Sequence, residues 1–102
     1  MKVSIIIAAY NIEDYINRCL NSIVNQSFKD IEIIVVNDGS TDNTINIINN
    51  FAKNDVRIKV IDKKNGGLIE ARKSGLARAS GEYILFLDGD DWLHIEAIEK
   101  LY

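Results

Sequence analysis

The sequence predicts an α/β fold with a mostly parallel sheet and flanking helices. Short runs of β-branched residues alternate four times with segments whose apolar residues follow the i, i+3, i+4, i+7 spacing of a helix. Most of these runs are almost continuously apolar, which is typical of parallel strands covered by helices on both faces. With 102 residues, the chain has room for one small domain or part of a larger one.

The expected strands share a high content of isoleucine and valine. They are residues 3–9, 31–36, 57–61 and 83–87. The third run alternates charged and apolar residues, so we expect it at an edge of the sheet. The first, second and fourth runs are expected to be buried on both faces.

The first two helices are predicted together with their caps. The first follows Asn11 as its N-cap residue, and Glu13 and Asp14 in its first turn suit the positive end of the helix dipole. The second helix follows Ser40, whose side chain is expected to cap it.

The last two helices are predicted from the spacing of their apolar residues. The third covers about 68–79 and is expected to end where Gly81 adopts the left-handed conformation. The fourth begins after Asp91 and continues to Tyr102. Because that apolar segment ends without a cap or polar tail, we expect the chain to be the N-terminal piece of a longer protein.

The composition argues against several classes of function. Twelve Lys and Arg against fifteen Asp and Glu give a net charge of -3, so no basic excess favours nucleic acid or an anionic membrane surface. The single cysteine, Cys19, is expected in the core, and one cysteine favours a reducing, cytoplasmic location. No apolar run is long enough to span a bilayer. The P-loop and the dinucleotide-binding glycine motif are both missing from the sequence.

The loop after the fourth strand carries the strongest candidate site. Asp88, Asp90 and Asp91 place three carboxylates at the carboxyl end of a strand, where open parallel sheets bind their ligands. Such close carboxylates repel one another, and a hard dication such as Mg²⁺ or Mn²⁺ relieves the repulsion. The alternative is a turn at Gly89 with Asp90 or Asp91 as the cap of the next helix. For His94, a capping or packing role is favoured over catalysis.

The other strand ends add weaker candidates, each with a structural alternative. Asp38 can accept hydrogen bonds from a ribose or a nucleobase, or can belong to a turn. Tyr10 can stack on a nucleobase or bury its ring in the fold. Arg72 is favoured as a partner for phosphate, whereas Gly66 and Gly67 are expected to form a plain loop.

Taken in order, these motifs resemble the beginning of a family 2 glycosyltransferase of the GT-A fold. The matching segments are residues 4–11, 32–42, 65–68, 71–72, 79–84 and 86–91. The resemblance implies that residues 1–102 form the Rossmann-like, nucleotide-sugar-binding half of such a domain. It also implies transfer of a sugar from a nucleotide donor, often UDP-linked, to an acceptor hydroxyl with inversion.

The resemblance assigns roles to individual residues. Ala8 and Tyr10 would flank the nucleobase, Asp38 would bind uracil, and Arg72 is the basic residue of the third motif. Within the acidic loop, Asp88 opens the motif. The implied nucleotide-sugar-binding residues are therefore Ala8, Tyr10, Asp38, Arg72, Asp88 and Asp90. The implied ligands of Mg²⁺ or Mn²⁺ are Asp91 and Asp90.

The chain departs from the family pattern at a few positions. Alanine at 8 or 9 replaces a common proline, and Asn37 stands where many members have an aspartate. Lys73 and Ile95 replace a frequent asparagine and a frequent proline. None of these changes removes an implied ligand.

The resemblance places the catalytic base beyond residue 102, so we expect the isolated chain to be inactive. The implied partners are a UDP-sugar donor and a saccharide or lipid-linked acceptor, in polysaccharide biosynthesis. Peripheral contact with the inner face of the cell membrane would come from regions outside the chain. Two alternatives remain, a nucleotide-sugar-binding module without catalysis and an α/β interaction domain whose acids only cap and turn.

Overall fold

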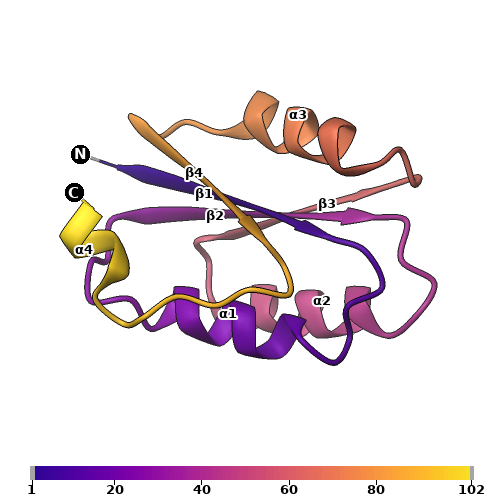
Figure 1. The fold of residues 1–102 in the computed structure, drawn as a ribbon, viewed down its shortest axis with the longest axis horizontal. Helices are drawn as coiled ribbons and strands as arrows, with labels where there is room; N and C mark the ends of the chain where they lie inside the picture. The colour runs from indigo at the N-terminus through magenta and orange to yellow at the C-terminus, as the bar shows by residue number, and fades with distance from the viewer. Residues whose placement is uncertain (1, 102) are drawn as a thin grey trace.

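A four-stranded sheet in the order β3-β2-β1-β4 forms the centre of the fold (Figure 1). The computed structural model describes residues 2–101, with side chains for residues 2–100. Each pairing along the sheet is parallel, which confirms the expected α/β architecture. The elements are β1 (Val3–Ala9), α1 (Ile16–Val24), β2 (Ile31–Asp38), α2 (Thr44–Asn54), β3 (Ile58–Lys63), α3 (Leu68–Arg78), β4 (Tyr83–Asp88) and α4 (Ala97–Leu101).

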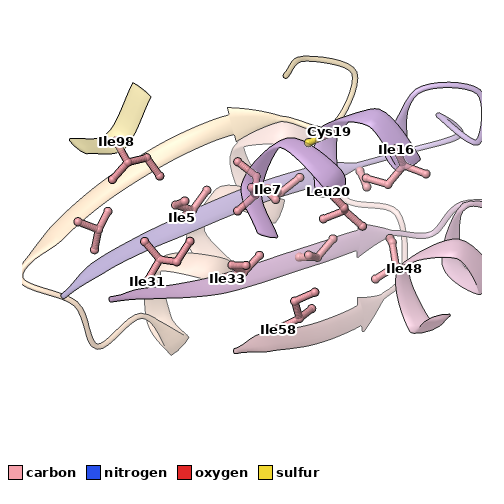
Figure 2. Packing of buried hydrophobic residues seen from close by; sticks show 14 residues of the cluster. Ile5, Ile7, Ile16, Cys19, Leu20, Ile31, Ile33, Ile48, Ile58 and Ile98 are labelled. Carbon is pink, nitrogen blue, oxygen red and sulfur yellow. The ribbon is translucent and has the colours of Figure 1, made fainter. Parts of the chain in front are cut away.

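The alternation of side chains along the strands divides the core into two parts. Odd-numbered residues of β1 and β2, such as Ile5 and Ile33, pack with α1 and α2, and Figure 2 shows this cluster. Even-numbered residues, such as Ile6 and Ile34, pack beneath α3 on the other face. Because side chains alternate with a period of two, the last residues of the strands also divide between the two faces.

The sheet has two edge strands, of which the sequence analysis predicted one. β3 lies at one edge, as its alternating pattern indicated. β4 lies at the other edge, so the prediction that it is buried on both faces was wrong. Tyr83, Ile84 and Phe86 are 52%, 38% and 41% exposed. Ile84 and Phe86 lie on the α3 side of the sheet, and they are exposed because α3 packs on β1 and β2 and leaves β4 uncovered.

Both predicted caps of the first two helices were wrong. α1 begins at Ile16, and Asn11 instead has a φ of 49° and accepts a hydrogen bond from the Thr41 N–H (2.8 Å). α2 begins at Thr44, and the Ser40 hydroxyl instead accepts a hydrogen bond from the Asn11 N–H (3.0 Å). The polar residues after β1 and β2 therefore join these two loops to each other.

The ends of the last two helices also differ from the prediction. Gly81 is not left-handed, and its missing side chain instead allows close approach to Ser4, whose hydroxyl accepts the Gly81 N–H (2.8 Å). α4 begins at Ala97 and not after Asp91, while Tyr102 lies outside the described residues. Among residues 2–101, no helix has the length and apolar character needed to cross a membrane.

A buried carboxylate joins three strands to the α3–β4 connection. Glu32 is 2% exposed and receives hydrogen bonds from the Ser4 hydroxyl (2.7 Å), the Ser80 N–H (2.9 Å) and Lys59 Nζ (2.5 Å). Burial alone would raise the pKa of Glu32, but these hydrogen bonds, led by the one from Lys59, lower it to about 2. Glu32 is therefore ionised and fully partnered in the folded protein.

Candidate functional site

The three acids after β4 converge on one point. Carboxylate oxygens of Asp88, Asp90 and Asp91 all lie within 4.8 Å of one another. The Asp91 N–H donates to the Asp88 carbonyl (3.0 Å), so the turn proposed as an alternative is present. Capping by Asp90 or Asp91 is not, because α4 begins only at Ala97. Three convergent carboxylates, of which those of Asp90 and Asp91 are exposed and have no helix to cap, fit the oxygen ligands that Mg²⁺ and Mn²⁺ prefer.

Arg72 approaches the acidic loop from α3. Its Nη2 lies 3.3 Å from Asp88 Oδ1, and its guanidinium carbon lies 5.6 Å from the centre of the Phe86 ring. Both contacts lie on the side of β4 that faces α3, because Phe86 and Asp88 are two residues apart on one strand. Arg72 is 41% exposed on its side chain, so it remains accessible to a ligand.

Asp38 holds the loop that leads into α3. Its two carboxylate oxygens accept the N–H groups of Gly66 (2.9 Å) and Gly67 (3.0 Å), and Lys63 Nζ lies 3.3 Å away. Burial alone would raise the pKa of Asp38, but these hydrogen bonds, led by that from Gly66, lower it overall. The residue is 4% exposed. In this structure, Asp38 therefore positions the loop that contains residues 66 and 67.

Substitution of Gly67 by alanine should lower the free energy of unfolding by about 2 kcal/mol. Gly67 has φ 93° and ψ 169°, a conformation that side chains other than glycine strongly disfavour. Urea denaturation would measure the loss. Gly66→Ala is the matched control, because a Cβ there would meet only the flexible end of Lys63 closely (2.9 Å) and would lie in ordinary contact with Glu70 Cβ (3.4 Å). Equal losses in the two variants would contradict the backbone explanation.

The two residues predicted to flank a nucleobase lie along β1 and just after it. Ala8 pairs in register with Asp88, and its carbonyl accepts the Gly89 N–H (3.0 Å). Tyr10 follows the strand and is 50% exposed, so its ring is not buried in the fold. The alternative that Tyr10 is a core residue therefore does not hold.

The structure gives a reason for the asparagine at position 37, where many family members have an aspartate. It is 2% exposed and its Nδ2 donates to Asp62 Oδ1 (2.9 Å) on the neighbouring strand. An aspartate at position 37 would place its carboxylate next to that of Asp62, and the two would repel. The amide of Asn37 instead donates a hydrogen bond to Asp62. Within the described part of the chain, Asn37 Oδ1 is a buried acceptor without a partner.

Cys19 is a core residue and His94 makes a local capping contact, as predicted. Burial, reinforced by the charges of Asp91 and Asp90, raises the pKa of the Cys19 thiol to about 12. The thiol is therefore protonated at neutral pH and is no nucleophile. His94 Nδ1 accepts the N–H of Glu96 (3.3 Å) just before α4, which is a local capping contact.

The predicted site residues form two groups at the carboxyl end of the sheet. Arg72 lies with the acidic loop at the end of β4, whereas Asp38 lies at the end of β2. β1, with Ala8, runs between them, which corresponds to a separation of two strands or about 10 Å. Gln26 and Ser22 contact the segment after the acidic loop, and no motif in the sequence marks them as site residues. Residue spacing alone does not distinguish a buried glutamine from an exposed one.

Comparison with known proteins gives one consistent result. The family model described as glycosyl transferase family 2 matches residues 4–102. The chain is 46% identical to the glycosyltransferase GlyA of Streptococcus pneumoniae over 101 residues, which are 99% of this chain and 14% of GlyA.

Solved structures share the fold as well as the sequence. The structure of S. aureus TarS in complex with UDP-GlcNAc matches with a TM-score of 0.91 and 38% identity, over 99% of this chain and 30% of that one. The mannosyltransferase PcManGT of Pyrobaculum calidifontis, in complex with GDP-Man and Mn²⁺, matches with a TM-score of 0.82 and 25% identity. That match covers 88% of this chain and 28% of the mannosyltransferase. This chain thus spans less than a third of each of these relatives.

Proposed function

The chain belongs to glycosyltransferase family 2, and on that premise we propose that it binds the nucleotide of a sugar donor across the carboxyl ends of β2, β1 and β4. One observation carries the proposal. The carboxylates of Asp88, Asp90 and Asp91 converge within 4.8 Å, and Arg72 contacts the first of them. For the protein that contains this domain, we propose transfer of the sugar to a hydroxyl of a saccharide or lipid-linked acceptor, with inversion.

The nucleobase end of the proposed site lies at β1 and β2. The exposed ring of Tyr10 offers a face for stacking, and Ala8, two residues earlier in the chain, has only a methyl side chain. Asp38 Oδ2 accepts one hydrogen bond within the described residues, from Gly67, and so retains a lone pair for the imide N–H of uracil. We propose UDP as the nucleotide because TarS, bound to a UDP-sugar, is more similar to this chain than the GDP-mannose-bound enzyme.

The diphosphate end of the proposed site lies at β4. We propose that Asp91 and Asp90 hold Mg²⁺ or Mn²⁺ while Asp88 orients Arg72. A bound dication would supply positive charge opposite the diphosphate that leaves the sugar. The Arg72 guanidinium is permanently charged and can turn from Asp88 to a phosphate oxygen. These residues would bind and orient the donor.

Thermal unfolding of the chain with UDP tests this proposal. We expect UDP with Mn²⁺ at 100 times its Kd to add about 2.7 kcal/mol to the stability of the folded state. EDTA should remove most of that gain, and GDP should give less. An unchanged melting temperature would instead favour an interaction domain with no nucleotide site. If UDP binds but the protein transfers sugar to no acceptor, a non-catalytic binding module is favoured.

A further inference from the structure

The segment after the acidic loop is held by hydrogen bonds to α1 and to the residues that follow it. We call residues 92–96 the strap, because they cross α1 without forming a helix. The Ser22 hydroxyl accepts the Leu93 N–H (3.0 Å), and Gln26 Nε2 donates to the His94 carbonyl (2.7 Å). The Ser27 N–H donates to the Ile95 carbonyl (2.8 Å).

Gln26 is the central residue of these contacts. It is fully buried, and its amide forms three hydrogen bonds. Nε2 donates to the carbonyls of Ser22 (2.9 Å) and His94 (2.7 Å), and Oε1 accepts the Ile98 N–H (3.1 Å). A buried amide with three partners fixes both chain segments, because each lost partner would leave a desolvated polar group.

The acidic loop also contacts α1 and the residues just before that helix. Cys19 Sγ lies 4.0 Å from the Asp88 carbonyl oxygen. At the first residue of the strap, the Arg18 guanidinium carbon lies 5.6 Å from the centre of the Trp92 ring. A side chain at Gly89 would collide with Ile12, so the loop passes close to this segment. The same helix therefore contacts the loop at its start and the strap at its end.

The local sequence favours a different conformation for the strap. Residues 92–101 have apolar residues at helical spacing, and an aspartate before them is a strong N-cap. A helix that began after Asp91 would turn the carboxylates of Asp90 or Asp91 toward its own N–H groups. The observed convergence with Asp88 depends on the strap remaining unwound.

We propose that Gln26 and Ser22 are positioning residues, which hold the strap unwound and thereby keep Asp90 and Asp91 convergent with Asp88. The inference rests on the proposed function in one respect, namely that the convergent acids bind a dication. Neither residue touches the acids directly. Each acts through the backbone of the strap, at Leu93 for Ser22 and at His94 for Gln26. Gln26 also accepts the Ile98 N–H at the start of α4.

Binding of Mn²⁺ alone, measured by calorimetry on the 102-residue chain, is the first test. Loss of a hydrogen-bond partner of a metal ligand typically weakens metal affinity about 10-fold to 100-fold. Because Gln26 acts one step further out, through the strap, we expect the lower limit, roughly tenfold, for Gln26→Leu. Ser22→Ala removes one contact with the strap, and one bond to the Cys19 carbonyl within α1, from a partly buried position. It should fold in any case and weaken affinity by a smaller factor. Ser4→Ala is the control, because it removes a buried hydroxyl next to Glu32, at the opposite end of the strands. It should leave Mn²⁺ affinity unchanged.

Nuclear magnetic resonance tests the positioning independently of metal. In Gln26→Leu, and to a smaller extent in Ser22→Ala, Cα chemical shifts of residues 92–96 should move toward helical values. The Asp91 N–H should then exchange with solvent about tenfold faster relative to Ser4→Ala. Unchanged shifts and exchange in both variants, or equal changes in Ser4→Ala, would overturn the proposal. If the wild-type chain binds no Mn²⁺, the metal part of the proposed function fails, while these shifts still decide the role of Gln26.

Discussion

Replacement of Asp91 by asparagine is expected to abolish the stabilisation of the chain by UDP and Mn²⁺. The substitution removes one of three converging negative charges and replaces a strong ligand of hard dications with a weak one. At 100 times Kd, the lost stabilisation is about 2.7 kcal/mol. For a domain of this size, that loss lowers the ligand-bound melting temperature by roughly 10–20 °C.

In the absence of UDP and metal, the same substitution should not lower the stability of the chain. Asp91→Asn relieves repulsion from Asp88 and Asp90, so the metal-free chain should be unchanged or slightly more stable. Asp14→Asn is the control, since Asp14 is an exposed acid in the turn before α1. A variant at Asp91 that loses stability in EDTA and keeps its response to UDP would show that the acid is structural.

Glu32→Gln is expected to lower stability at neutral pH by about 2 kcal/mol, with allowance for solvent screening of the half-exposed Lys59. The amide loses the charge that attracts Lys59 Nζ (2.5 Å) and has only one oxygen for partners that now use two. Urea denaturation at pH 7 measures this loss. Glu82→Gln, at an exposed acid on the neighbouring connection, should cost little.

The effect of Glu32 should disappear at low pH. Its carboxyl pKa is lowered from 4.5 to about 2 in the folded protein, so the folded state binds fewer protons than the unfolded state between these values. The stabilisation is complete above pH 4.5 and is lost as the pH falls toward 2. Wild type and Glu32→Gln should therefore converge in stability near pH 2. A constant difference from pH 7 to pH 2 would contradict the linkage.

Much of the fold could be predicted from local sequence. The order of strands and helices, the parallel sheet and the edge position of β3 all follow from apolar periodicity. The acidic loop could also be predicted from local sequence, because its three aspartates lie within four residues and follow a strand directly. The apolar pattern of β4 led to the wrong prediction that both its faces are buried, because the sequence of an apolar strand does not show whether a helix covers it.

The starts of the helices could not be predicted, for a physical reason. Asn11 and Ser40 have the residue types of N-caps, but their polar groups hydrogen-bond between the two loops. These partners are about 30 positions apart in sequence, so no local pattern reveals them. The same holds for the strap, where contacts with Ser22 and Gln26 replace the helix that local propensity favours.

The sequence by itself determined the family, the α/β architecture and the acids at the end of β4. These features depend on residue type and on spacing over a few positions. Only the tertiary structure decided how the polar groups are used. It assigned Asp38 to the glycine loop, Glu32 to the α3–β4 connection and Gln26 to the strap. Each of these groups is buried and must find hydrogen-bond partners, and the fold supplies those partners from distant segments of the chain.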